Sequence, residues 1–280
     1  MKIRAVQFSP RLGDVPANLA THRHHVEEAS RAGVELVVFP ELAISGYHLM
    51  DLAEELALTP MSPEFAELAS LSKATALITG APFEATPGRI TNSALCFADG
   101  ELRHRHDKVQ LPNFGMFQET MIFAPGTSFR TFLLGGFRIG ILVCREILFP
   151  IYPYLYFLQG ADLVVAISNS PHRGLGPEGF ASTRLWETMG TTCSLFFCQH
   201  FLFVNRTGFE EGLGFPGGSF FARAGQGIET RAPQLDEATI DVELSLDEVR
   251  RARLAGNYLR DENPELALRE IQRILHERDR

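Results

Sequence analysis

The chain has 280 residues, 45% of them apolar and 21% charged, which is typical of a globular protein with a large core. Its formal net charge of −8 argues against nucleic acid as a partner, because a phosphate backbone is bound by a net basic face. The N-terminus lacks the apolar core of a secretory signal, and the most apolar later stretch, 194–205, is shorter than the roughly 18 residues of a membrane span. We therefore expect a cytoplasmic protein with no membrane partner.

Strand and helix patterns alternate along the chain with no Ser/Gly linker between them. In the first half, apolar runs predict strands at 2–9, 34–39, 77–82, 90–98 and 102–106, and helical spacing predicts helices at 18–32 and 63–75. In the second half, the same patterns predict a helix at 179–192 and strands at 131–134, 137–143, 162–168, 201–205, 219–222 and 239–242. We interpret residues 1–245 as one domain and 246–280 as a charged, helical C-terminal tail.

Two stretches echo each other, GVELVVFPE at 33–41 and GADLVVAIS at 160–168. Each contains a helix stop, an acidic residue, a buried strand and a polar residue at the strand end. Two similar halves packed as a sandwich would produce this pattern, and so would any α/β protein. Two glycine-rich segments, 174–179 and 212–217, are expected to be loops beside a pocket.

Reactive side chains follow three of the predicted strands, and strand ends are where α/β folds place their chemistry. Glu41 comes after Pro40, and a desolvated carboxylate there can act as a general base. Lys108 follows the strand at 102–106, where a fixed cation can stabilise an oxyanion. Cys144 ends the strand at 137–143 beside a helix start, which lowers the pKa of a thiol. Each residue alone is more often structural: a salt-bridge acid, a surface lysine and a packed cysteine.

The order Glu, Lys, Cys is what an amide hydrolase needs, with a base, an oxyanion stabiliser and a nucleophile. The surrounding motifs resemble those of the nitrilase superfamily of carbon–nitrogen hydrolases. They are FPEL around Glu41, HDKVQLPNFGMFQE around Lys108 and Glu119, GILVCREILFP around Cys144, and further along ADLVVAISNSP, FVNRTG and GGSFFARAGQG.

This resemblance implies an α/β fold of the nitrilase-like kind, a four-layer α-β-β-α sandwich. It implies that Glu41 is the base, Lys108 stabilises the oxyanion and Cys144 forms a thioester. Glu119 would position the substrate or the lysine, although a buried acid that only holds a loop fits equally. The family uses no metal and no cofactor. The tail, 246–280, would pack at a subunit interface and give a homo-oligomer, a dimer or larger.

The substrate is left open by these motifs. The segments LPNFGMFQE, SNSP and FPGGS look like the glutaminase domain of glutamine-dependent NAD synthetase, but the chain carries no synthetase domain. Arg145 stands where those glutaminases usually carry an acidic residue. It indicates a substrate carboxylate or merely the lack of an α-amino group, and a solvated arginine fits equally. Five residues are expected to bind the substrate: Phe114, Arg145, Ser170, Pro171 and His172.

Our first hypothesis is an ω-amidase-like or other hydrolase of small-molecule amides, which would release ammonia or an amine and a carboxylic acid. Two alternatives share its chemistry: a nitrilase acting on a nitrile, and a glutaminase subunit that supplies ammonia to a separate synthetase. The intact Glu–Lys–Cys set argues against a fourth reading, a non-enzymatic relative. The four cysteines show no C-x-x-C spacing, so a structural metal is not expected.

Overall fold

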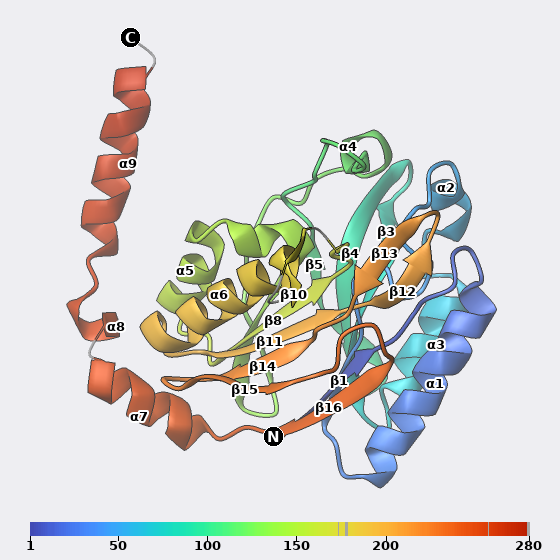
Figure 1. Cartoon of the computed structure of the whole chain (residues 1–280), viewed down its shortest axis with the longest axis horizontal. Coiled ribbons are helices and arrows are strands. Elements are labelled where there is room, and N and C mark those ends of the chain that lie inside the picture. The colour runs from blue at the N-terminus through green and yellow to red at the C-terminus, as the bar shows by residue number, and fades with distance from the viewer. Residues whose placement is uncertain (173, 177–178, 257, 279–280) are drawn as a thin grey trace.

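Two six-stranded sheets pack face to face in the computed structural model, which describes residues 1–172, 174–176, 179–256 and 258–278 (Figure 1). The strands of the first sheet, in spatial order, are β16 (Ala238–Glu243), β1 (Lys2–Gln7), β2 (Leu36–Val38), β3 (Ala76–Thr86), β4 (Arg89–Ala98) and β5 (Glu101–Asp107). Those of the second are β15 (Gly227–Arg231), β14 (Phe220–Arg223), β11 (His200–Asn205), β8 (Leu163–Ser168), β7 (Phe137–Val143) and β6 (Phe132–Leu134).

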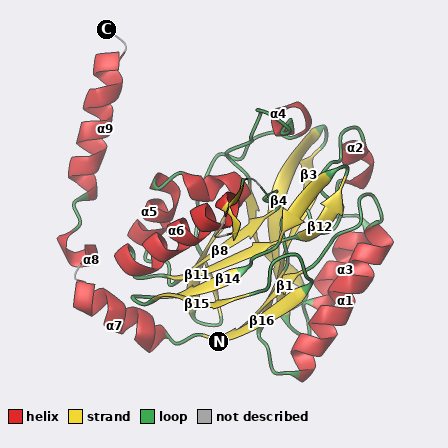
Figure 2. Cartoon of the chain, viewed as in Figure 1, coloured by secondary structure: helices red, strands yellow, loops and turns green. Residues whose placement is uncertain are grey.

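Helices cover the outer face of each sheet (Figure 2). The first sheet carries α1 (Val15–Arg31) and α3 (Pro63–Leu71), and the second carries α5 (Ile151–Leu158) and α6 (Ala181–Phe196). The shorter α2 (Leu52–Leu56), α4 (Glu119–Ile122) and the 3₁₀ helix η1 (Cys144–Leu148) lie in connections. The layers are therefore α-β-β-α, and the predicted four-layer sandwich is confirmed.

The strand pattern explains how the layers pack. Leu36 and Val38 face the core between the two sheets, whereas Val37 faces the core under the helices, because successive side chains in a strand point to opposite faces. Both faces are covered, so the strand is apolar throughout. Ile141 and Val165 face the intersheet core from the second sheet.

The carboxyl ends of the parallel strands lie at one edge of the sandwich. β1, β2 and β3 are parallel in the first sheet, and β7, β8 and β11 are parallel in the second. β5 runs in the direction of β3, because β4 is antiparallel to both. The carboxyl ends of β2, β5, β7 and β8 therefore carry the side chains that form the site below.

Two predictions about the chain between the main strands are corrected. Gly212–Gly217 was expected to be a loop, but residues Leu213–Pro216 form β13, which pairs with β12 (Thr207–Glu210) in an antiparallel ribbon. Pro216 is tolerated because it is the last residue of a two-stranded ribbon. The expected helix at 179–192 begins at Ala181, because β10 (Gly179–Phe180) pairs with β9 (Leu175–Gly176).

The C-terminal segment forms α7 (Leu246–Gly256), α8 (Tyr258–Asp261) and α9 (Pro264–Arg278), and α9 projects away from the sandwich (Figure 1). None of the described α9 side chains is buried. Within the described ranges, no helix has the length and apolar character to cross a membrane.

Candidate active site

A buried lysine bridges two carboxylates at the edge where the strand ends meet. Lys108 directly follows β5, and its Nζ donates to Glu41 Oε1 at 2.7 Å and to Glu119 Oε1 at 2.8 Å. No more than 4% of any of these side chains is exposed. Burial by itself lowers the pKa of Lys108, but the two carboxylates outweigh it and raise that pKa above its ordinary value. The lysine is therefore a fixed cation.

Both oxygens of Glu41 are held in place. Oε1 also accepts from Asn92 Nδ2 at 2.8 Å, and Oε2 accepts from the backbone N–H of Asn169 at 2.7 Å. Asn92 lies on β4 of the first sheet, and Asn169 follows β8 of the second. The carboxylate therefore joins the two sheets at the site, and its direction is set from both sides.

Two glycines let backbone segments approach closely behind the charged residues. A Cβ at Gly80 would lie 2.2 Å from the backbone nitrogen of Leu42, the residue after Glu41. A Cβ at Gly126 would lie 2.0 Å from the carbonyl oxygen of Asp107, and Gly126 donates its N–H to the carbonyl of Lys108 at 2.8 Å. Only glycine fits at either position without moving the adjacent chain.

Cys144 is the first residue after β7 and has a positive φ of 48°. Non-glycine residues rarely adopt this conformation, and it is concentrated at functional sites where the surroundings impose it. The side chain is buried, and this burial, with a further contribution from Glu41, raises the pKa of the thiol to about 12, although Lys108 lowers it. The expectation that the helix start lowers this pKa is therefore wrong, because burial outweighs one short 3₁₀ turn.

A second buried carboxylate, Glu146, holds the turn at Cys144 against the segment around Lys108. Its Oε2 accepts from His106 Nε2 at 2.8 Å and from the backbone N–H of Val143 at 2.7 Å. Its Oε1 accepts from the backbone N–H of Val109 at 2.6 Å. His106 and Val109 flank Lys108, and Val143 precedes Cys144, so a single side chain fixes both segments.

Glu119 begins α4 and has one oxygen fully engaged. Its Oε1 accepts from Tyr47 Oη at 2.7 Å in addition to the lysine. Its Oε2 has no hydrogen-bond partner among the described residues, and the same holds for Asn92 Oδ1 and for both side-chain polar atoms of Asn169. Buried polar atoms are normally paired, so these atoms around Glu41 and Lys108 are available to bind water or a ligand.

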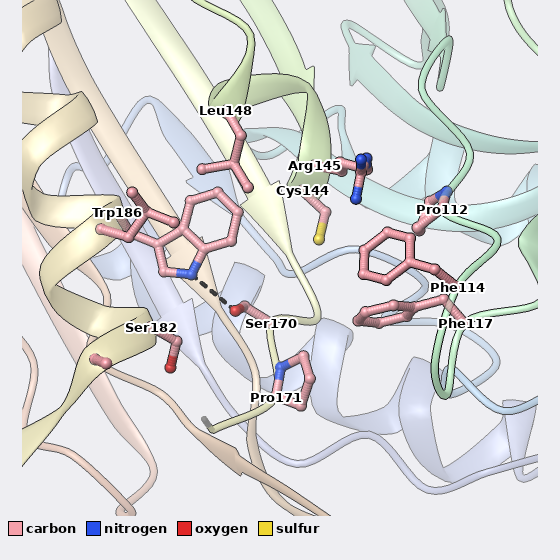
Figure 3. Close-up of a pocket in the computed structure, with 12 residues that line it drawn as sticks. Pro112, Phe114, Phe117, Cys144, Arg145, Leu148, Ser170, Pro171, Ser182 and Trp186 are labelled. Atoms are coloured by element: carbon pink, nitrogen blue, oxygen red, sulfur yellow. Dashed lines mark hydrogen bonds between the residues drawn. The ribbon is translucent and has the colours of Figure 1, made fainter. Parts of the chain in front are cut away.

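A cavity of about 280 Å³ opens beside Cys144 (Figure 3). It is lined by Pro112, Phe114, Phe117, Cys144, Arg145, Leu148, Ser170, Pro171, Ala181, Ser182, Leu185 and Trp186. Ser170 Oγ accepts from Trp186 Nε1 at 2.7 Å, which fixes the indole as one wall. Apolar and aromatic walls with few polar groups are typical of small-molecule sites.

The structure places four of the five predicted substrate-binding residues in this cavity: Phe114, Arg145, Ser170 and Pro171. His172 is exposed and stacks on Phe180, with 5.2 Å between ring centroids, and it is not among the described lining residues. No group of three or more His, Cys, Asp or Glu in the described part of the chain could hold a metal ion.

Several site residues were missed by sequence reasoning: Tyr47, Asn92, Asn169, Glu146 and Trp186. Glu146 offered a signal, since an acidic residue two positions after a nucleophile at a strand end can reach back to the strand. The others carry no local pattern, because they come from separate elements.

Comparison with known proteins agrees with this geometry. A family model described as carbon–nitrogen hydrolase matches residues 2–254, and the chain belongs to this family. Glutamine-dependent NAD(+) synthetase of Acinetobacter baylyi is 27% identical over 254 residues, which cover 89% of this chain and 45% of that protein. An (R)-stereoselective amidase of a Pseudomonas species is 30% identical over 268 residues, which cover 93% of this chain and 91% of that one.

Among solved structures, the carbon–nitrogen hydrolase of Helicobacter pylori G27 superimposes with a TM-score of 0.85. Its sequence is 21% identical, and the match covers 95% of this chain and 96% of the other, so the two share the fold. The chain spans less than half the length of the NAD(+) synthetase that it matches, and most of the amidase.

Proposed function

We propose that this protein hydrolyses the C–N bond of a small-molecule amide through a thioester on Cys144. The observation that carries the proposal is the position of Lys108 Nζ, which lies 2.7 Å from Glu41 and 2.8 Å from Glu119 beside a strained, buried cysteine. Cys144 lines the cavity, and a fixed cation and a carboxylate base lie beside it, which together are the parts that acyl transfer needs.

The proposed reaction begins with a neutral thiol, because the pKa of Cys144 is raised to about 12. Glu41 takes the thiol proton as the sulfur attacks the amide carbon. The Lys108 ammonium and the backbone N–H of Arg145, the second residue of η1, stabilise the oxyanion. Collapse of this intermediate expels the amine with the proton from Glu41. Water, activated by the same carboxylate, then hydrolyses the thioester to the carboxylic acid and frees the thiol.

The size of the cavity supports a small substrate. Its volume of about 280 Å³ lies near the lower end of the roughly 300–1,000 Å³ that small-molecule sites enclose. The amidase relative, which matches over nearly its whole length, supports an amide as the substrate.

A glutaminase subunit is the second candidate, because the first relative compared is a glutamine-dependent NAD(+) synthetase matched over 45% of its length. In that case the amide would be glutamine, and the ammonia would pass to a separate synthetase. Glutamine turnover that greatly exceeds turnover of other amides would favour this function.

Ammonia release from a panel of aliphatic amides, glutamine and the matching nitriles tests the proposal. The wild type is expected to hydrolyse at least one amide, and mass spectrometry of acid-quenched reactions should find the acyl group on the peptide that contains Cys144. Cys144→Ala should abolish turnover with an unchanged circular dichroism spectrum. Nitrile turnover without amide turnover would indicate a nitrilase, and no turnover with any compound would contradict the proposal.

We further propose a homo-oligomer in which the C-terminal tail contacts a second subunit. Leu268, Ile271 and Leu275 lie on one side of α9 by their spacing, and 46% to 56% of each is exposed. An apolar helix face left in solvent costs free energy that burial against another chain recovers. Light scattering should show a dimer or larger for the full chain and a smaller species when residues 263–280 are deleted. An unchanged mass would contradict this role of the tail.

A cytoplasmic location is also part of the proposal. All four cysteines are free thiols, as expected in a compartment that keeps thiols reduced.

A further inference from the structure

Arg145 is the only charged side chain among the described residues that line the cavity. It follows Cys144 directly in sequence, and Figure 3 shows it beside Cys144 and above the ring of Phe114. Its guanidinium carbon lies 4.4 Å from the ring centroid of Phe114 and 5.7 Å from that of Phe149. No carboxylate in the described part of the chain forms an ion pair or hydrogen bond with it.

The nearby carboxylates are engaged elsewhere. Glu146, the next residue in the chain, accepts from three N–H donors of other segments. Glu119 Oε1 accepts from Lys108 and Tyr47, and its Oε2, although unpaired among the described residues, forms no ion pair with Arg145. Arg145 is therefore the one pocket cation that the described structure leaves without an anion.

The aromatic contacts hold the guanidinium without consuming its hydrogen-bonding capacity. A guanidinium that stacks on aromatic rings uses its flat face, while its N–H donors point outward in the plane. That fork matches the two oxygens of a carboxylate and forms short, charge-assisted hydrogen bonds with them. A half-buried cation among apolar walls gains from such a partner, because an unpaired charge there is poorly solvated.

We propose that Arg145 binds a carboxylate of the substrate, so that the preferred substrate is an amide that carries a carboxylate a few bonds from the scissile carbonyl. This inference rests on the proposed function and names the substrate class of the same site. Because Arg145 and Cys144 are adjacent, the carboxylate of the substrate must lie a short distance from its scissile carbonyl. The small cavity limits the length of the acyl chain between them. The monoamide of a short dicarboxylic acid has this chemistry.

Binding can be measured apart from catalysis, because Trp186 is the only tryptophan of the chain and lines the cavity. Its fluorescence is titrated in the Cys144→Ala background with glutaramate, its methyl ester and 5-aminopentanamide. Glutaramate is expected to bind about 10- to 150-fold more tightly than the ester, the range for a hydrogen bond to a charged group. Arg145→Gln should remove this difference, and Arg145→Glu should favour the amine.

Two further variants separate recognition from general effects. Arg145→Lys keeps the charge but loses the fork, so it should retain a part of the preference for glutaramate. Arg130→Gln removes one exposed arginine, with no ion pair in the described structure, and should leave the preference unchanged. Thermal denaturation of each variant shows that the fold persists.

Equal affinity of the Cys144→Ala protein for glutaramate and its ester would overturn the inference. An equal loss of affinity for all three compounds on adding Arg145→Gln would also overturn it. Turnover of neutral amides by the wild type is followed separately. Turnover without the carboxylate preference would leave the proposed function standing and refute the role of Arg145. A carboxylate preference without turnover of any amide would support carboxylate binding by Arg145 and refute the proposed function.

Discussion

Replacement of Gly80 by alanine tests whether the placement of Glu41 limits the reaction. The new Cβ would lie 2.2 Å from Leu42 N and 2.6 Å from Glu41 Cα, and both contacts are backbone. Ordinary contact begins near 3.4 Å, so the segment must move by about 1.2 Å, the difference between 3.4 and 2.2 Å. A displacement of about 1 Å at a reacting group costs roughly 100-fold in rate, equivalent to about 2.7 kcal/mol in the activation free energy.

We expect kcat for the best amide to fall about 100-fold in Gly80→Ala with a smaller change in KM. Overpacking should also lower the free energy of unfolding by about 1 to 3 kcal/mol, so thermal denaturation accompanies the rate assay. The matched control is Gly256→Ala, whose Cβ would meet side chains alone, the ring of the half-exposed Tyr258 at 2.8 Å and Cys198 Sγ at 3.5 Å. A folded Gly80→Ala variant with more than half of the wild-type kcat would refute the reasoning that the close approach positions Glu41.

Three other changes probe the same cluster. Tyr47→Phe removes a hydrogen bond to Glu119 and should lower the free energy of unfolding by about 1.5 to 3 kcal/mol, measured by urea denaturation; no loss would mean that the bond is absent in solution. Glu146→Gln replaces one acceptor oxygen with an amide NH2 that faces N–H donors, and it should lower kcat and the melting temperature together; a normal kcat would remove its positioning role. Glu41→Gln should slow iodoacetamide alkylation of Cys144 at pH 7, since the base is lost. It should not slow alkylation above pH 10, because Glu41 raises the pKa of Cys144 and its removal favours the thiolate; faster alkylation than wild type at pH 7 would contradict a base role.

The site residues that could be predicted from the sequence are those whose position follows from a pattern in the neighbouring residues. Glu41 and Cys144 each end a continuous apolar strand, and a strand buried on both faces must place its first polar side chains at the sheet edge. Lys108 and Glu119 were found through the motif that links them, and the structure joins their side chains at 2.8 Å. The four layers were implied by the resemblance to the family, because the alternation of strands and helices alone fits any α/β protein.

The parts that were missed depend on contacts between distant segments. Asn92 meets Glu41 across 51 residues, Tyr47 meets Glu119 across 72, and Asn169 meets Glu41 across 128. Periodicity carries no information about such pairs. The sign of the Cys144 pKa shift was wrong for a similar reason, because desolvation depends on everything packed around the thiol and the helix start was the only visible cause.

The raised pKa of the thiol has a consequence for how the site selects its reaction. A thiol with a pKa of about 12 is almost entirely protonated at neutral pH, so the free enzyme does not display a reactive thiolate. In the proposed mechanism, proton transfer to Glu41 becomes favourable only as the sulfur bonds to carbon and the negative charge moves to an oxygen near Lys108. The lysine is already fixed by two carboxylates, so no reorganisation accompanies that step. Reactivity therefore depends on a substrate carbonyl held in the cavity beside Cys144. On this reasoning Arg145 contributes by holding the carboxylate at the other end of the same substrate.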